Sequence, residues 1–301
     1  MEFQTDFPQI KSTICRAGTS SNRLTCFTRR MGDSVVQIRH IEHFHWQLSE
    51  SECPVSFISN GSGISLAAAV ELASIAAHRR ADSVETNAKV RVSRNPIWGL
   101  IKESRWPLRT SCVTMRDGDT TVIVLPARND DPWWTGCIRS LLADLAANGF
   151  PPGLTRGLAG AVIEMVDNVW LHSETTAPGL LAYQIRRRKF AFSVIDTGIG
   201  VLDSLRRNHT YRYLSSSMEA IRKAIEPGTS RFENGGGMGF PSLFHALADL
   251  WGTARIRSGE AALLIDHMQE KRSRRSVYLP YLPGAHISVR CALDPPSSSI
   301  N

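Results

Sequence analysis

The sequence lacks a long apolar segment, and this absence excludes a membrane-spanning protein. Its longest mostly apolar run, residues 64–77, is too short to cross a bilayer and contains Glu71. The N-terminus carries Asp6, Lys11 and Arg16 and has no apolar core, which argues against a secretory signal. We therefore expect no membrane association and no membrane-bound sensor segment.

Cysteine and histidine patterns typical of disulfide frameworks or zinc sites are also missing. The six cysteines are scattered, at positions 15, 26, 53, 112, 137 and 291. None forms C-x-x-C, so we expect reduced thiols and a cytoplasmic setting. His40, His43 and His45 lie close together, but no acidic or cysteine partner accompanies them, and we interpret them as ordinary strand-face residues.

The charge balance is basic without a nucleic-acid-binding pattern. The formal net charge is +7, and basic runs occupy residues 186–189 and 271–275. Such runs can contact nucleic acid or an acidic partner, but no aromatic residues interleave with them. For residues 186–189 we favour a solvated turn between two strands.

Three motifs occur in order in the second half of the chain, and the first is E-M-V-D-N-V-W-L-H at residues 164–172. Apolar spacing predicts a helix over 158–171, which places Glu164, Asn168 and His172 on one stripe. A carboxylate can accept a proton, and an amide oxygen suits Mg²⁺. The alternative is a polar stripe that faces water.

The second motif, D-T-G-I-G, starts at Asp196 after an alternating run, residues 190–195, that predicts a strand. Gly198 and Gly200 permit a sharp turn and a close approach of a ligand to the backbone. An ionised aspartate accepts hydrogen bonds, for example from an exocyclic amine such as that of adenine. An ordinary strand-to-loop turn capped by the aspartate is the alternative.

The third motif, G-G-G-M-G, spans residues 235–239 and precedes an apolar segment, 240–251, that we expect to be helical. Free backbone N–H groups at a helix start favour an anion such as phosphate. Any isolated glycine cluster can instead be a flexible loop.

In this order the motifs resemble the GHKL ATPase superfamily, which includes gyrase B, MutL and the histidine kinases. The resemblance covers residues 135–294, about half of the chain, and implies an α/β protein with a Bergerat-type two-layer sandwich, a mixed sheet with helices on one face. It implies binding of ATP and Mg²⁺, with Glu164 as general base, Asn168 as the Mg²⁺ ligand and Asp196 reading adenine. It also implies two glycine boxes, the first with Gly198 and Gly200 and the second with Gly235, Gly237, Met238 and Gly239.

Within the superfamily the first motif is most similar to that of anti-sigma-factor kinases and related small bacterial ATPases. Residues 281–289 resemble the closing strand of the family, with Ala285 where a threonine is frequent. No lysine follows Gly239 in the lid, and no histidine lies in an H-E-x-x-x-P box, which argues against self-phosphorylation on histidine.

Composition leads us to expect a polar tail (1–33), an N-terminal α/β unit (34–126), a linker (127–134) and a short tail (296–301). Between the linker and the last tail, the resemblance implies an ATP-binding domain (135–295). In the N-terminal unit we expect strands at 35–41, 54–59, 83–92 and 120–125 and a helix at 64–78. This pattern resembles a STAS-like domain.

The function implied is a Mg²⁺-ATP-binding regulatory protein that hydrolyses ATP or transfers its γ-phosphate to a serine or threonine of a partner protein. That partner is a STAS-like or regulatory protein in this interpretation, and a homodimer is common in the superfamily. Two alternatives stay open: a non-catalytic nucleotide-sensing module and, with weaker support, a nucleic-acid-associated ATPase.

Overall fold

The computed structural model describes residues 27–31, 37–50, 55–59, 64–81, 88–92, 96–109, 111–126, 131–232, 239–248, 250–266 and 273–294. Within these ranges, no helix is long and apolar enough to cross a membrane. Cys112, Cys137 and Cys291 are free thiols, and the other three cysteines lie outside the described side chains.

The N-terminal third forms a small parallel sheet whose strands alternate with helices. The strands β1 (Phe27–Met31), β2 (Val55–Ser59) and β3 (Ala88–Val92) pair in that order. Parallel neighbours need crossover connections, and the helices provide them. The helices are α1 (Ile38–Glu50), α2 (Leu66–Ala81) and α3 (Pro96–Ser104).

Three expectations for this part of the chain are wrong. The strand expected at 35–41 is replaced by α1, because Ile41 and Phe44 are buried at a spacing of three and so lie on one helix face. The histidines near Trp46 are therefore on a helix, not a strand. The segment expected to be a polar tail contains the strand β1. Of the strand expected at 83–92, the described residues are Ala88–Val92, which form β3.

The second sheet has six strands, and every neighbouring pair in it is antiparallel, in contrast to the expected mixed sheet. Its order is β4-β5-β6-β7-β9-β8. The strands are β4 (Val113–Asp117), β5 (Thr120–Val124), β6 (Leu180–Arg186), β7 (Lys189–Ile195), β8 (Trp251–Asp266) and β9 (Ser273–Ala292). The basic run at 186–189 is the exposed turn between β6 and β7, as expected. Arg187 and Arg188 have φ values of 48° and 62°, as a primed hairpin turn requires.

This sheet crosses the expected domain boundary. The hairpin β4–β5 precedes residue 126 but pairs with β6 through β5, so it belongs to the large sheet. The helix α4 (Pro132–Ala147) begins inside the expected linker, where the Asp131 side chain accepts a hydrogen bond of 2.8 Å from the Trp133 N–H.

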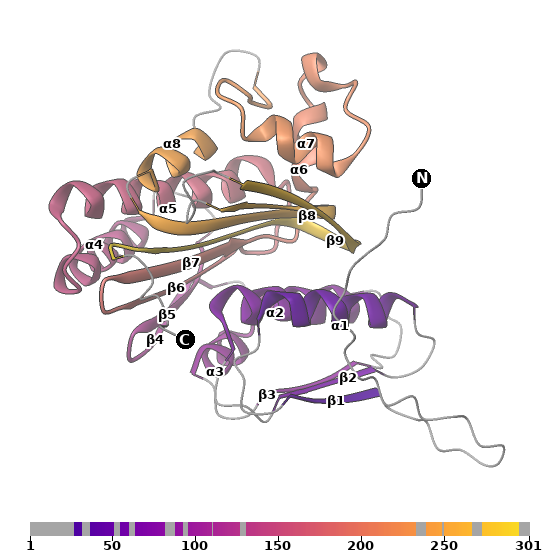
Figure 1. The fold of residues 1–301 in the computed structure, drawn as a ribbon, viewed down its shortest axis with the longest axis horizontal. Helices are drawn as coiled ribbons and strands as arrows, with labels where there is room; N and C mark the ends of the chain where they lie inside the picture. Colours follow the sequence, from indigo (N-terminus) through magenta and orange to yellow (C-terminus); the bar gives the residue numbers. More distant parts are fainter. Residues whose placement is uncertain are drawn as a thin grey trace.

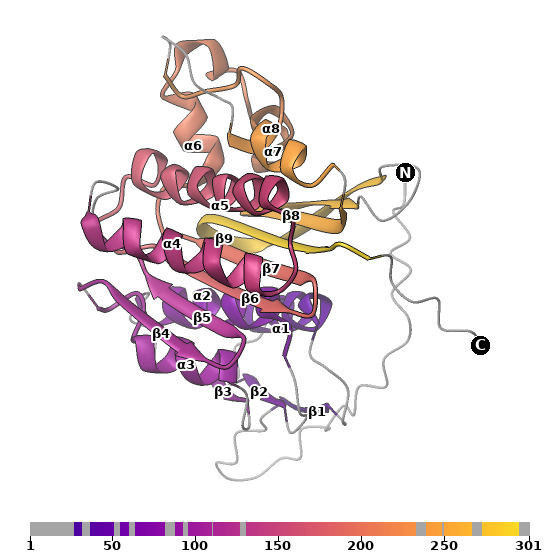
Figure 2. The same ribbon diagram turned by 90° about the vertical axis from the view of Figure 1, so that its left-hand side faces the viewer.

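Helices cover both faces of the large sheet: helices from the second half of the chain pack on one face, and helices of the N-terminal unit pack on the other. On one face pack α4, α5 (Pro152–His172) and α8 (Gly239–Ala246), with α4 and α5 side by side (Figure 2). On the other face, α1, α2 and α3 lie between the large and the small sheet (Figure 1). All five residues of β5 are buried, which is typical of a strand that is covered on both sides.

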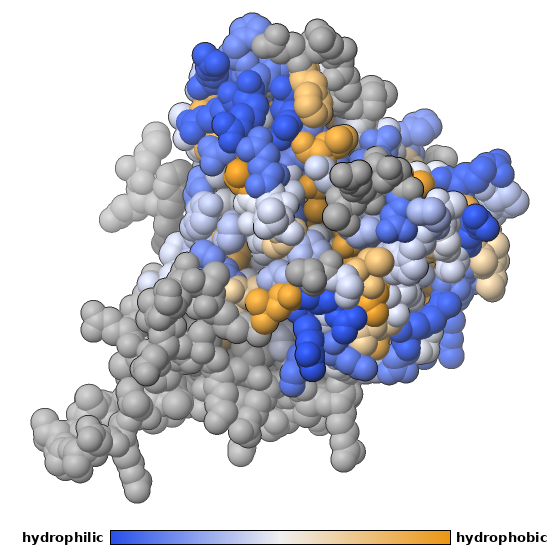
Figure 3. All heavy atoms as spheres, turned by 180° about the vertical axis from the view of Figure 1, so that it is seen from behind, coloured by the Kyte–Doolittle hydropathy of each residue, from blue (hydrophilic) through white to orange (hydrophobic). Residues whose placement is uncertain are grey.

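At one end of the sheet lie α6 (Gly200–Arg206), the short helix η1 (His209–Tyr211) and α7 (Ser217–Ala224) (Figure 1). The α7 side chains Met218 and Ile221 pack on apolar residues of β8. The helix expected over 240–251 ends at Ala246, and Trp251 starts β8 instead, where it pairs with Ala292 of β9. A Cβ on Gly252 would lie 2.7 Å from the Arg290 carbonyl oxygen, so this close pairing needs a glycine. On the side seen in Figure 3, the described surface is mainly hydrophilic with small apolar groups.

A buried ionic cluster joins α1 and α2 to β8. Glu71 on α2 accepts hydrogen bonds from Arg255 and Arg257, and Arg255 also donates to Glu42 at 2.8 Å. Arg257 Nη2 lies 2.9 Å from His45 Nδ1, so His45 is a buried hydrogen-bonding residue. Burial raises the pKa of the Glu71 carboxyl, but the two arginines outweigh it and lower that pKa to about 2.

Candidate functional site

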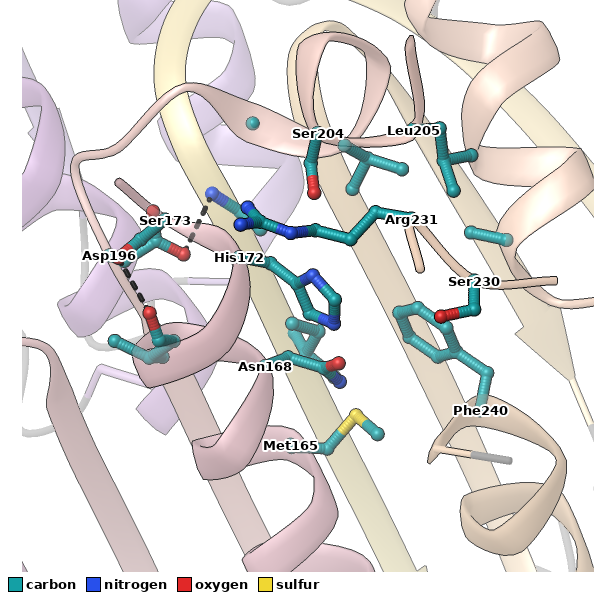
Figure 4. A pocket seen from close by; sticks show the side chains of 16 residues that line it. Met165, Asn168, His172, Ser173, Asp196, Ser204, Leu205, Ser230, Arg231 and Phe240 are labelled. Atoms are coloured by element: carbon teal, nitrogen blue, oxygen red, sulfur yellow. Dashed lines mark hydrogen bonds between the residues drawn. The ribbon is translucent and has the colours of Figure 1, made fainter. Parts of the chain in front are cut away.

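The polar stripe expected on the first motif is present on α5. Buried residues such as Val162, Met165 and Val166 form the core face of this helix, whereas Glu164, Asn168 and His172 are only partly buried. The helix ends at Ser173, whose hydroxyl donates to the Val169 carbonyl at 2.6 Å. Asn168 and His172 point into a cavity (Figure 4).

Asp196 is fully buried at the end of β7, where backbone N–H groups hold both of its carboxylate oxygens. Gly198 N–H donates to Oδ1 at 2.7 Å, and Ala285 N–H donates to Oδ2 at 3.3 Å. Burial raises the pKa of Asp196 to about 6, against the opposing effect of these two hydrogen bonds. The carboxylate is therefore mostly ionised at neutral pH and fixed in position.

The first glycine pair is required by the backbone around Asp196. A Cβ on Gly198 would lie 2.0 Å from the carbonyl oxygen of Ser173, so no other residue fits there. Gly200 has φ of 77°, and a Cβ on it would lie 2.6 Å from Ser258 Oγ. Gly198 lets the turn after β7 pack directly on the end of α5, and Gly200 lets it pack on β8 and β9.

The cavity has a volume of about 80 Å³ and brings several predicted residues together. Asn168, Asp196 and Gly200 all line it. The remaining lining residues are Met165, Val169, His172, Ser173, Val201, Ser204, Leu205, Ala224, Ser230, Arg231, Phe240, Ala285 and Ile287. One water needs about 10–15 Å³ on this kind of measure, so the cavity can hold part of a larger ligand.

Glu164 and Gly239 do not line the cavity but lie next to Asn168. A Cβ on Gly239 would lie 3.3 Å from Asn168 Nδ2 and 3.6 Å from Glu164 Oε2. The start of α8 thus lies against the Glu164–Asn168 stripe. Gly235, Gly237 and Met238 lie outside the described residues, so the second glycine box is placed only at Gly239.

Two polar atoms at the cavity are buried without a hydrogen-bond partner among the described residues: Asn168 Nδ2 and His172 Nδ1. Burial, assisted by the charge of Arg231, lowers the pKa of His172 to about 4, so its ring is neutral at pH 7. Buried polar groups usually have partners, and unpaired ones at a cavity are typical of a site whose ligand supplies the partner.

The sequence analysis missed Arg231, which lines the cavity from the loop after α7. Arg231 Nη1 donates to Glu174 Oε1 at 3.1 Å, and its guanidinium lies 5.0 Å from the centre of the Phe232 ring. The available signal was a single arginine four residues before the glycine run, in R-F-E-N-G-G-G. Arg231 precedes the glycine run, whereas the family resemblance draws attention to a lysine after Gly239.

The predicted closing strand is part of β9, as expected. Ala285 lines the cavity next to Asp196, and its methyl group leaves the wall apolar where the resemblance leads one to expect a threonine hydroxyl.

In comparisons with known proteins, no protein-family model matches this chain, and no curated protein gives a significant match to its sequence. Within the described ranges, no group of three or more His, Cys, Asp or Glu side chains could hold a metal ion. The function is therefore inferred from the cavity and the residues around it.

Proposed function

We propose that the chain is a Mg²⁺-ATP-binding regulatory protein of the GHKL type, with the large sheet and the helices α4 to α8 arranged in a Bergerat-type fold that includes the β4–β5 hairpin. The observation that carries this proposal is the convergence of Asp196 and Asn168, from separate elements, on one cavity with Gly239 beside them. The order of their motifs along the chain is the order that the family resemblance implies.

The Asp196 end of the cavity suits an adenine ring. Each carboxylate oxygen already accepts one backbone N–H, and an ionised carboxylate has about four acceptor sites, so capacity remains for an exocyclic amine. Val201, Leu205 and Ile287 contribute apolar walls, which suit a flat aromatic ring.

The Asn168 end fits a metal-bound polyphosphate. Mg²⁺ usually takes only one or two protein ligands beside waters and phosphate oxygens, so a three-residue cage is not required. The Asn168 amide oxygen and the Glu164 carboxylate would offer oxygen ligands to the metal. The start of α8 lies beside them, where the helix dipole favours an anion. When bound, Mg²⁺ would neutralise charge on the phosphates.

In the reaction, Glu164 would accept the proton of the attacking hydroxyl. With water as the nucleophile the outcome is hydrolysis, and with a partner serine or threonine it is phosphoryl transfer. We infer that the N-terminal unit, which contacts the large sheet through α1 and α2, contacts a regulatory protein partner.

Glu164→Gln tests the role of the base. Phosphate release should fall at least about 100-fold while ATP binding persists, because a general base contributes about 10²–10⁴-fold and is not needed for binding. Released phosphate and calorimetric ATP binding are measured on the same samples, with and without cell extract as a source of partner.

Glu226→Gln, at an exposed carboxylate that pairs with Lys223, is the matched control and should leave both quantities unchanged. Turnover that survives Glu164→Gln would show that the base assignment is wrong.

A further inference from the structure

The Arg231 side chain extends across the cavity toward the end of α5 (Figure 4). It starts from the loop after α7 and ends at Glu174, which follows the α5 cap residue Ser173. Only 19% of the Arg231 side chain is exposed, although the hydrogen bond that its guanidinium makes with Glu174 lies on the exposed side of the cavity wall. This ion pair connects two walls of the cavity.

Glu174 is paired with a second arginine at the same time. Arg207 Nε donates to Oε1 at 3.1 Å and Nη2 to Oε2 at 2.6 Å, a two-pronged contact. Glu174 also has φ of 50°, a backbone conformation that costs free energy for a residue other than glycine. Because Arg207 engages both oxygens, the carboxylate would stay paired if Arg231 moved away.

The charges on the cavity wall are few and of opposite sign. Among the described lining residues, Arg231 has the only cationic side chain and Asp196 the only anionic one, since the low pKa of His172 keeps it neutral. A ligand whose ring carries an N–H donor and whose phosphates carry negative charge would complement Asp196 and Arg231. A guanidinium recognises phosphate oxygens through paired hydrogen bonds.

We propose that Arg231 distinguishes phosphorylated ligands from the bare nucleoside, by exchanging the Glu174 carboxylate for a phosphate oxygen while Arg207 keeps Glu174 paired. This inference rests on the proposed nucleotide site. The exchange replaces one charge-assisted hydrogen bond with another, so it needs no buried charge to be left alone. In the absence of ligand, Glu174 occupies the guanidinium group that a phosphate would bind, and so competes with the phosphate.

A purely structural role for the ion pair makes a different prediction. A contact that only fastens the loop after α7 to the end of α5 would, when lost, weaken adenosine and ATP binding equally. A phosphate-recognising arginine changes the preference for ATP over adenosine and leaves adenosine binding almost unaltered. The ratio of the two affinities therefore separates these roles.

The test is calorimetric titration of adenosine, AMP, ADP and Mg²⁺-ATP into wild type, Arg231→Gln and Glu174→Gln, with Arg212→Gln as control. Arg212 is an exposed arginine that follows η1. We expect Arg231→Gln to lower the ATP-to-adenosine affinity ratio about tenfold or more, as for the loss of a hydrogen bond to a charged group. Glu174→Gln should raise the ratio, because Arg231 is no longer held, and Arg212→Gln should leave it unchanged.

The outcomes separate this inference from the proposed function. A wild type that binds no adenine ligand would overturn both. A wild type that binds ATP, with the same ratio in Arg231→Gln, would overturn only the role of Arg231. If Arg231→Gln does not fold, as judged by circular dichroism, Glu174→Gln decides: a raised ratio supports the role and an unchanged ratio contradicts it.

Discussion

At the residue scale, the environment of Asp196 follows only in part from its motif. The letters D-T-G-I-G predict a turn and a hydrogen-bond acceptor, and the turn is present. The sequence could not show that Ala285, from a strand much later in the chain, donates to the same carboxylate. Nor could it show the burial that raises the pKa of this group, because burial depends on the whole fold.

The raised pKa of Asp196 leads to a pH prediction for ligand binding. The ionised form dominates above about pH 6, and this form is the better acceptor for an amine. Adenosine affinity should fall as the pH drops from 7.5 to 5, by up to about tenfold at one pH unit below the pKa. Adenosine is the suitable ligand because it has no phosphate that titrates in this range.

The measurement is a series of adenosine titrations between pH 5 and 7.5, on wild type and on Asp203→Asn, which removes an exposed carboxylate of α6. Both proteins should show a midpoint near pH 6. A flat profile in the wild type would contradict the assignment of Asp196 as the acceptor.

At the scale of elements, local periodicity predicted α2, α5, β6 and β7 because each has a long or regular apolar pattern. It failed for α1, where the first residues alternate like a strand and the helical spacing of Ile41 and Phe44 becomes visible only over a longer window. It could not reveal the ion pairs between Glu71 and the arginines of β8, which are distant in sequence.

Removing the Glu71 charge should destabilise the protein strongly. Glu71→Gln leaves Arg255 and Arg257 buried without their shared carboxylate, and breaking such a pair costs about 3–5 kcal/mol. The folded pKa of about 2 lies below the ordinary 4.5, so this contribution is present above pH 4.5 and is lost as the pH falls through 2. The free energy of unfolding in urea, at pH 7 and below pH 4.5, checks both statements.

Glu42→Gln is the matched control, because Glu42 pairs only with Arg255 in the same cluster and is more exposed. Glu42→Gln should lower the free energy of unfolding clearly less than Glu71→Gln does. Equal losses for the two variants would mean that Glu71 has no special role in joining α2 to β8.

At the scale of the whole molecule, β9 separates the N-terminal helices from the cavity. Ala285 and Ile287 line the cavity, whereas His286 between them lies on the opposite face, 3.2 Å from Ser74 Oγ on α2. Successive residues of a strand point to opposite faces, so one strand serves both units. This arrangement could not be predicted from composition, which placed a boundary near residue 127 and assigned β4 and β5 to the wrong side of it.

Of the candidate site, the sequence predicted the stripe on α5, the carboxylate after β7 and the two glycines of its turn. It missed Arg231, since a single arginine in a loop has no periodic or motif signal. The contact between Arg231 and Glu174 depends on how the end of α5 approaches the loop after α7.

The central claim is that Asp196 and Asn168 form one nucleotide site, and ATP binding by wild type and Asp196→Asn tests it most directly. Calorimetry with Mg²⁺ should show binding by the wild type and at least about tenfold weaker binding by the variant, because a hydrogen bond to a charged group is lost. Asp203→Asn should bind like the wild type. ATP binding of equal strength in Asp196→Asn, or none in the folded wild type, would contradict the account.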